Sequence, residues 1–341
     1  MASVESQNTG VEAPGERAAG PADGVVVGID SGGSGLRIAL ARAADGTVLD
    51  RVTAPGPVRT GPGGISAAHF LESVLPAVAT LRARVADGRP VRAAAVGAAG
   101  MATLGTELRA VLPGAFADAW GVRGTALAAD AVTAYAGALG ARPGAVVAGG
   151  TGLIALGTDL ARWRRADGWG HLLGDCGSGA WIGRAGLEAA LRAHDGRRGG
   201  SAALLARAEK LHGPAAGLPA ALYPRADRPA VLAAFAPEVA ACAADDPAAA
   251  GILERAAEHI ADAAEAACPP GPESVVALTG GLFRLGEPLL VPLRAALADR
   301  LPGVGRVAPA GDPLDGAVTL AAGLAGGGIR LPEDPALLRI A

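Results

Sequence analysis

The sequence predicts an α/β fold of two lobes with a cleft between them. Each half begins with a strand, a glycine-rich turn and a second strand, and a similar order of strands and helices follows in both halves. A Gly-Ala-Arg-Pro-Gly break over residues 140–144 separates the halves. The length of 341 residues is sufficient for two domains of about 150 residues each.

In the first half, short apolar runs predict strands, and apolar side chains spaced by three and four residues predict helices. The Asp45-Gly46 pair is typical of a hairpin turn. The predicted strands are 25–29, 36–41, 48–52, 91–96 and 125–129, and the predicted helices are 65–85, 106–111 and 131–139.

The second half restarts in the same way after the break. Its predicted strands are 145–148, 153–156, 162–167, 274–278 and 305–308, and its predicted helices are 178–193, 202–211, 230–240, 248–267, 288–301 and 314–325. Residues 1–22 are polar and predict a disordered tail. We therefore expect a first lobe over 23–140 and a second lobe over 145–311 with a helical insertion.

Composition excludes several classes of function. Thirty Lys and Arg against 33 Asp and Glu give a net charge of −3, so sequence-independent nucleic-acid binding is not expected. No run of about 18 strongly apolar residues predicts a membrane span. Lys210 is the single lysine and follows no glycine loop, which excludes a Walker A phosphate site.

The cysteines and the N-terminal segment indicate the compartment. Cys176, Cys242 and Cys268 are far apart and form no Cys-x-x-Cys pair, so structural zinc is not expected. A sparse, odd number of cysteines fits a reducing compartment. Residues 1–22 lack the apolar segment of a secretory signal. We expect a cytoplasmic protein without a membrane or nucleic-acid partner.

Three glycine-rich turns each have a functional and a structural interpretation. Glycines let backbone N–H groups approach an anion, but they are also common in plain hairpin turns. The first turn, Asp30-Ser-Gly-Gly-Ser34, also offers a carboxylate to Mg²⁺. The turn 149–152, Gly-Gly-Thr-Gly, holds the matching place in the second half, so the two turns would grip a triphosphate from both sides. Thr279-Gly-Gly281 leaves room for a flat ring or for tight helix–strand packing.

Asp130 ends an apolar strand, where a carboxylate in a cleft suits a general base for a hydroxyl. The alternative is that Asp130 caps the helix that follows, which aspartate does well. The sequence leaves both interpretations open.

The stretch from Gly168 to Ser178 combines glycines with Trp169, His171 and Asp175. An aromatic face and a carboxylate together suit a sugar, because the ring stacks on the C–H face and the carboxylate accepts from hydroxyls. A histidine in such a stretch is more often structural.

These motifs together resemble the BadF/BadG/BcrA/BcrD ATPase family, and within it the N-acetylglucosamine kinases. The resemblance covers roughly residues 24–326, and its most specific element is Gly-Trp-Gly-His-Leu-Leu-Gly-Asp-Cys-Gly-Ser at 168–178. It implies two ribonuclease-H-like lobes with ATP and an amino sugar in the cleft, and phosphorylation of the primary (6-) hydroxyl. It also implies a homodimer and a final helical segment, 312–330, that packs back on the first lobe.

The resemblance further implies a role for each motif. Asp30 would lie near Mg²⁺, Asp130 would be the catalytic base, and Trp169, His171 and Asp175 would contact the sugar. The residues implied to bind ATP are Asp30, Gly32, Gly33, Ser34, Gly150, Thr151, Gly152, Gly280 and Gly281.

Two segments depart from the family pattern at positions that contact the sugar. The vertebrate enzymes have an asparagine where this chain has Gly56-Pro-Val-Arg-Thr60, and a serine is replaced within Gly97-Ala-Ala-Gly100. The sugar therefore stays open among N-acetylglucosamine, glucosamine and other hexosamines, with Arg59 one candidate to replace the asparagine.

Two other functions have less support in the sequence. An ATPase that activates a dehydratase needs a cysteine pair for an iron–sulfur cluster, and Cys242 and Cys268 are 26 residues apart without cluster-like context. A sugar-sensing regulator would add a DNA-binding segment, for which residues 1–22 are too short and too acidic.

Overall fold

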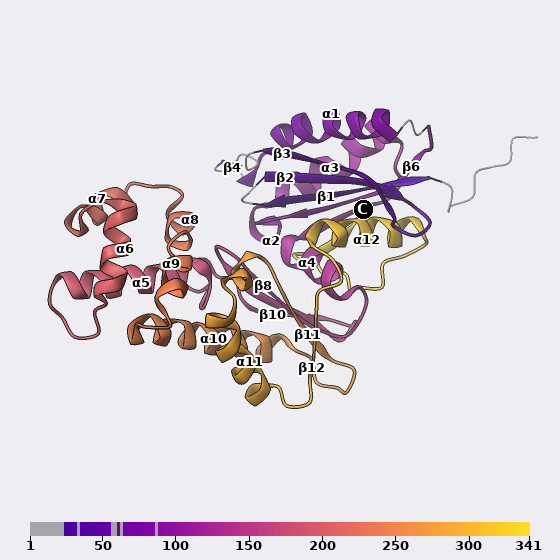
Figure 1. Cartoon of the computed structure of the whole chain (residues 1–341). Coiled ribbons are helices and arrows are strands. Elements are labelled where there is room, and N and C mark those ends of the chain that lie inside the picture. The colour runs from indigo at the N-terminus through magenta and orange to yellow at the C-terminus, as the bar shows by residue number, and fades with distance from the viewer. Residues whose placement is uncertain (1–23, 33–34, 56–59, 62–63, 86–87) are drawn as a thin grey trace, which may run out of the picture.

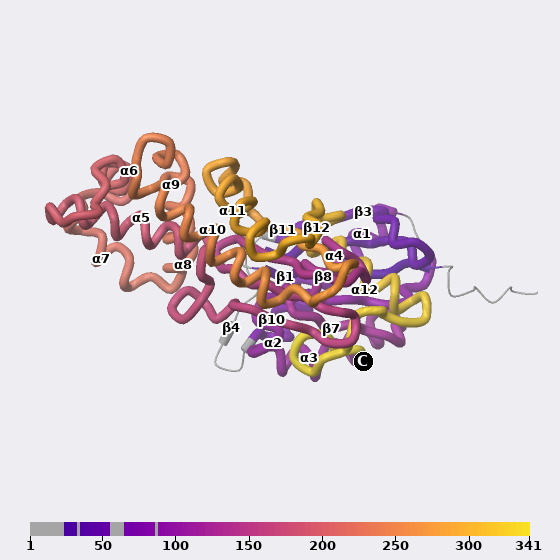
Figure 2. The backbone as a smooth tube through the Cα atoms, turned by 90° about the horizontal axis from the view of Figure 1, so that it is seen from below, coloured from indigo at the N-terminus to yellow at the C-terminus, as the bar shows by residue number. Residues whose placement is uncertain are grey.

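The computed structural model describes residues 24–32, 35–55, 60–61, 64–85 and 88–341. The predicted tail, Gly33, Ser34 and Arg59 lie outside this part of the chain. Figure 1 shows two lobes, each built on a sheet, and Figure 2 gives the same chain seen from below.

The first lobe is a mixed sheet with strand order β13-β7-β6-β1-β2-β3. Strands β1, β2 and β3 are antiparallel, β6 and β7 continue parallel to β1, and β13 from the C-terminal end pairs antiparallel with β7. The elements are β1 (Val25–Gly32), β2 (Gly35–Arg42), β3 (Val48–Pro55), β4 (Thr60–Gly61), β5 (Gly64–Ile65), α1 (Ala67–Val85), β6 (Val91–Ala98), α2 (Met101–Leu104), α3 (Thr106–Trp120), β7 (Thr125–Ala129), α4 (Asp130–Leu139), α12 (Pro313–Ala325) and β13 (Leu338–Ile340).

The second lobe has the strand order β10-β9-β8-β11-β12. Strands β8, β9 and β10 are antiparallel, and β11 runs parallel to β8 and β12. Helices α5 to α9 extend away from this sheet (Figure 1). The elements are β8 (Gly144–Gly149), β9 (Leu153–Thr158), β10 (Trp163–Asp167), α5 (Gly179–His194), α6 (Ala202–His212), η1 (Ala215–Gly217), α7 (Leu218–Leu222), α8 (Arg228–Ala233), α9 (Ala236–Cys242), α10 (Pro247–Ala267), β11 (Val275–Thr279), η2 (Gly281–Leu285), α11 (Glu287–Arg300) and β12 (Gly305–Val307).

Both sheets therefore begin with three antiparallel strands and continue with parallel ones, which confirms the predicted fold class of two ribonuclease-H-like lobes. The domain boundaries stay a prediction. Among the described residues, no helix combines the length and the apolar character that crossing a membrane requires.

Local structure differs from the sequence prediction at several places, and the short elements β4, β5, α2 and α7 were not predicted. The helix expected over 106–111 continues to Trp120, because Leu108, Leu112 and Phe116 extend one buried face. The single helix expected over 230–240 is two helices, since Pro237 near the start of α9 cannot continue the preceding helix. The strand β13 was not predicted at all.

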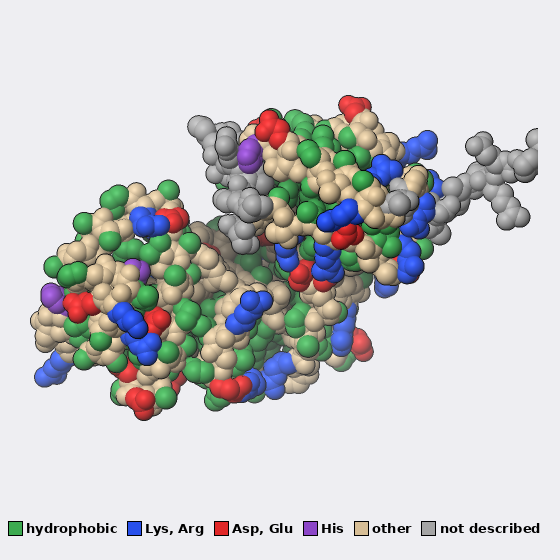
Figure 3. Space-filling view, turned by 45° about the horizontal axis from the view of Figure 1, so that its top comes forward, with side chains coloured by type: hydrophobic (Ala, Val, Ile, Leu, Met, Phe, Trp, Pro, Cys, Tyr) green, Lys and Arg blue, Asp and Glu red, His purple; other side chains and the backbone are tan. Residues whose placement is uncertain are grey.

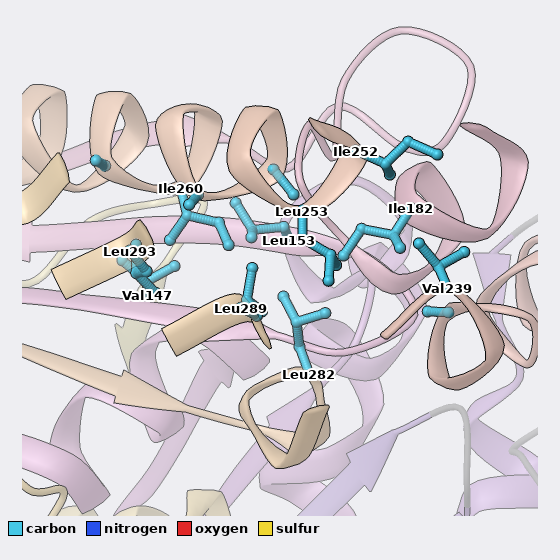
Figure 4. Close-up of a cluster of buried hydrophobic side chains, with 14 of the residues drawn as sticks. Val147, Leu153, Ile182, Val239, Ile252, Leu253, Ile260, Leu282, Leu289 and Leu293 are labelled. Atoms are coloured by element: carbon cyan, nitrogen blue, oxygen red, sulfur yellow. The ribbon is translucent and has the colours of Figure 1, made fainter. Parts of the chain in front are cut away.

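The described residues form three hydrophobic clusters, one of which joins the two lobes. One lies between the first sheet and α1 and α3, and a second fills the second lobe (Figure 4). The third is shared: it joins α4 and α12 to strands of both sheets and buries Tyr135 completely. The two lobes are therefore attached through an apolar core, and α12 lies on the first sheet so closely that a Cβ on Gly28 would be 2.7 Å from Val318.

Candidate active site

Asp30 lies near the end of β1 and is buried, with 8% of its surface exposed. Its Oδ2 accepts hydrogen bonds from Nε and Nη2 of Arg37 at 2.9 and 2.6 Å, and Nη1 of the same guanidinium donates to Asp312 at 2.7 Å. Burial raises the pKa of Asp30, and the hydrogen bonds from Arg37 oppose that rise. Sequence reasoning missed Arg37, because its partner Asp312 is 275 residues away.

Asp130 is the first residue of α4, directly after β7. Because β1, β6 and β7 are parallel, Asp130 lies at the same sheet edge as Asp30, on the order of 10 Å away across the intervening strand. The N-cap of α4 is Ala129, so the alternative interpretation of Asp130 as the residue that caps this helix is wrong. Its Oδ1 accepts from the N–H of Ala131 at 2.9 Å.

The Asp130 side chain reaches solvent yet has protein on most sides, as a residue on the floor of a cleft does. Loss of surrounding water raises its pKa, the negative charge of Asp30 raises it further, and Arg165 of the second lobe lowers it. Arg165 lies on β10, so this electrostatic interaction connects the two lobes at the edge that carries Asp130. Figure 3 shows a hollow between the two lobes.

The other two glycine turns lie side by side in the second lobe. Strands β8 and β11 are parallel neighbours, so the turn 149–152 after β8 and Gly280 after β11 lie at the same edge of the second sheet. Gly280 has a φ of 103°, and a Cβ on it would overlap the carbonyl of Gly149. The start of α5 is anchored on the same turn, because Gly179 and Ala180 donate to the carbonyls of Gly150 and Thr151 at 2.9 and 3.0 Å.

Three of the predicted ATP-binding glycines have open space beside them. A Cβ on Gly32, Gly150 or Gly281 would meet nothing within 4 Å, and none of the three has a positive φ. Neither backbone conformation nor packing explains glycine at these positions, and the space lets a ligand approach the backbone. The backbone of these turns is therefore accessible to a ligand.

The loop 168–178 is held by two aspartates in the left-handed region, Asp167 at a φ of 59° and Asp175 at 53°. The Asp167 carboxylate accepts from the N–H groups of Asp175 and Cys176 at 2.6 and 2.8 Å. The Asp175 carboxylate accepts from Gly170 at 3.1 Å and lies against Gly152. Burial raises the pKa of Asp175. Asp175 therefore joins this loop to the turn 149–152.

Trp169 is 66% exposed, and one face of its ring carries the Arg165 guanidinium at 4.5 Å. Arg165 also donates to the carbonyls of Asp167 and Gly168 at 3.0 and 2.6 Å. His171 is half-buried and interacts electrostatically with Asp175. The structure thus brings the three predicted sugar residues together on one loop, and adds Arg165 and Asp167, which the sequence analysis did not single out.

The donor set fits magnesium that arrives with a nucleotide. Within the described ranges, no group of three His, Cys, Asp or Glu residues could form a metal cage. Mg²⁺ usually takes one or two carboxylates and keeps waters and phosphate oxygens as its other ligands. Asp30 alone satisfies that requirement, through Oδ1, since Arg37 occupies Oδ2.

The segment 97–100, one of the two departures from the family pattern, packs closely on α4 at its first residue. A Cβ on Gly97 would overlap the side chain of Thr133, so position 97 has no room for a side chain. The other departure, over 56–59, lies outside the described residues.

Comparison with known proteins identifies the family. The model of the BadF/BadG/BcrA/BcrD ATPase family matches residues 27–321. The structure is similar to a crystal structure of a putative N-acetylglucosamine kinase from Chromobacterium violaceum, with a TM-score of 0.71 and 31% identity over 87% of this chain and 99% of that one. A putative N-acetylglucosamine kinase from Porphyromonas gingivalis has the same fold, with a TM-score of 0.64 and 19% identity over 86% and 97% of the two chains.

A curated relative matches over a shorter segment. The N-acetylmuramic acid/N-acetylglucosamine kinase of Clostridium acetobutylicum is 45% identical over 69 residues, which are 20% of this chain and only 22% of that kinase. The family match, by contrast, spans most of both lobes. The chain belongs to the BadF/BadG/BcrA/BcrD ATPase family.

Proposed function

We propose that this protein is a kinase that transfers the terminal phosphoryl group of ATP to the 6-hydroxyl of an amino sugar, with N-acetylglucosamine as the favoured acceptor. The observation that carries the proposal is the position of Asp130 at the end of β7, where it interacts electrostatically with Arg165, the residue that stacks on Trp169. The names of the two structural relatives and of the Clostridium kinase support the choice of acceptor.

In this proposal Asp130 is the general base. It receives the proton of the sugar hydroxyl as that oxygen bonds to phosphorus and ADP leaves. Burial raises the pKa of Asp130, which makes its ionised carboxylate a better proton acceptor. Trp169 offers a ring face to the sugar, and Asp175 accepts from a hydroxyl or from the turn that holds the phosphates.

The ATP site is proposed at the three glycine turns. Backbone N–H groups at Gly32 and Thr151 would hold phosphates, and Gly281 would lie against the adenosine. The N–H of Gly150 donates to the carbonyl of Gly152 at 2.9 Å, so Gly150 would contribute open space beside the phosphates. Mg²⁺, held by Asp30 and the phosphates, neutralises charge on the phosphate oxygens when it is bound. We also propose a homodimer, which the family resemblance implies, and a cytoplasmic location, which the sparse cysteines favour.

Cys242 and Cys268 argue against the dehydratase-activator alternative. Both are free and buried, one at the end of α9 and the other after α10. Neither thiol is presented at the surface, where a cluster shared with a second subunit would form.

The proposal is tested by ADP release with Mg-ATP against a panel of N-acetylglucosamine, glucosamine, N-acetylmuramic acid, N-acetylmannosamine and glucose. We expect N-acetylglucosamine to give the highest kcat/KM. A higher kcat/KM for another amino sugar would support the kinase activity but assign a different acceptor. No stimulation by any sugar, with ATP still bound, would refute the kinase.

A further inference from the structure

Residues 329–341 return from α12 to the first sheet and end as β13. This segment, here called the C-terminal strap, lies beyond residues 27–321, where the family model matches. It pairs with β7 in antiparallel register, with Leu338 opposite Ala128 and Ile340 opposite Ala126. Leu331 and Leu338 are buried in the core shared by the two lobes.

The strap bonds directly to the residue before Asp130. The N–H of Ala129 donates to the carbonyl of Leu337 at 2.8 Å, and Thr125 and Ala341 exchange two hydrogen bonds at the other end of β7. The Asp334 carboxylate accepts from the N–H groups of Ala336 and Leu337 at 2.8 and 2.9 Å, which fixes the turn that presents Leu337. Removing this support would leave β7 as an open sheet edge.

The same strap also bonds to the second lobe. Trp163 begins β10, and its indole N–H donates to the carbonyl of Pro332 at 2.7 Å. The Trp163 ring packs edge-on against Tyr135 of α4, with centroids 5.3 Å apart. Trp163 pairs with Thr158, and Asp167 with Ile154, so Trp163 lies at the end of β10 away from the glycine turns.

Strand β10 connects this contact to the cleft. Arg165 and Asp167, at the cleft end of β10, hold Trp169 and the loop 168–178. The strap therefore contacts the two strands that carry the opposed halves of the acceptor site, β7 with Asp130 and β10 with the sugar loop. The bond from Trp163 to Pro332 adds a directional contact between the lobes to the shared apolar core.

We propose that the C-terminal strap is a positioning element that fixes β7 and β10 relative to each other, and so sets the distance between Asp130 and the loop that binds the sugar. The consequence for catalysis rests on the proposed function. The mechanical part does not, because lobe separation and strand protection are measurable without turnover.

Trp163→Phe tests the contact between lobes, since it removes one N–H and keeps an aromatic ring. The matched control is Trp120→Phe, whose ring stacks on Phe116 within the first lobe. Spin labels at Glu72→Cys and Glu258→Cys, both exposed, report the distance between lobes once the native cysteines are replaced by alanine. Kinetics are measured with the native cysteines in place.

We expect Trp163→Phe to broaden the distance distribution and to lower kcat/KM for the sugar by about two- to tenfold, the range that one lost hydrogen bond spans, with the KM for ATP unchanged. If Trp163→Phe and Trp120→Phe give the same distribution, the coupling of the lobes is refuted. A broadened distance distribution in a protein that phosphorylates no sugar would support the coupling of the lobes by the strap and refute the proposed kinase activity.

Asp334→Ala tests the support of β7 while the chain length is kept. We expect hydrogen–deuterium exchange of peptides covering β7 to rise about tenfold, as local opening becomes easier. Asp45→Ala is the control, because Asp45 makes a similar bond to Thr47 in an exposed hairpin. Unchanged exchange in β7 would overturn the proposed role of the strap.

Discussion

Arg37 donates two hydrogen bonds to a single carboxylate oxygen of Asp30, Oδ2, and leaves Oδ1 without a partner among the described residues. The same guanidinium bonds to Asp312, the N-cap of α12. Arg37 therefore orients the carboxylate proposed to hold Mg²⁺ and ties it to the helix that joins the lobes.

Arg37→Met should lower the free energy of unfolding by about 1–3 kcal/mol, because it leaves the buried Asp30 carboxylate without its charged partner. Arg42→Met on the same strand is the control. It breaks an exposed ion pair with Asp45 and should cost less than about 1 kcal/mol. Urea denaturation compares them, and equal losses would show that the Arg37 contact contributes no more than a surface pair.

Asp130→Asn should lower kcat by a factor on the order of 10² or more, because a general base is lost, while ATP binding stays the same. The folded state holds the Asp130 proton more tightly than the unfolded chain does, so stability falls as the pH rises through that raised pKa. At pH 7 the variant should therefore be no less stable than the wild type. Asp118→Asn, at an exposed site on α3, is the control; wild-type turnover in Asp130→Asn would exclude this base.

The acid limb of the pH–rate profile should lie above pH 3.8, the ordinary value for aspartate, because the pKa of Asp130 is raised. Arg165→Met removes the positive charge that opposes this rise. The limb should then move to higher pH, and the KM for sugar should increase as Trp169 loses its support. The control is Arg162→Met, an exposed neighbour paired with Asp159. A limb that stays in place would show that Arg165 does not act on Asp130.

Much of the site could be predicted from the sequence because its parts are local. A carboxylate or a glycine turn directly after an apolar strand is read from neighbouring residues, and parallel pairing then brings the strand ends to one edge. Asp30, Asp130, Gly150 and Gly281 were singled out in this way, and the structure places them at the ends of paired strands, while their roles stay predictions.

The parts that could not be predicted depend on pairs far apart in the chain. Arg37 reaches Asp312, and Trp163 reaches Pro332, across 275 and 169 residues. The strand β13 has only three residues and no hydrophobic periodicity long enough to recognise. Its role depends on β7 having a free edge, which only the assembled sheet reveals.

Gly150→Ala and Gly281→Ala test whether glycine is needed at these positions for ligand binding or for packing. Each added Cβ meets no protein atom, so the free energy of unfolding should not fall. In a nucleotide complex the Cβ would occupy ligand space, and we expect KM for ATP to rise by roughly tenfold or more, the effect of overpacking by about 1–3 kcal/mol. Gly114→Ala, in an open position on α3, is the control. Unchanged KM values would place the nucleotide elsewhere.

Gly316→Ala should be among the most destabilising single changes in this chain. Helix α4 crosses α12 at this point, and a Cβ on Gly316 would lie 2.6 Å from the backbone nitrogen of Gly137 and overlap the carbonyl of Thr133. Both neighbours are helix backbone and cannot move aside, so we expect a loss of about 3 kcal/mol or more in urea denaturation. Gly114→Ala makes the same change in an open helix and should instead gain about 0.5–1 kcal/mol. Wild-type stability in Gly316→Ala would mean that the two helices do not meet backbone to backbone.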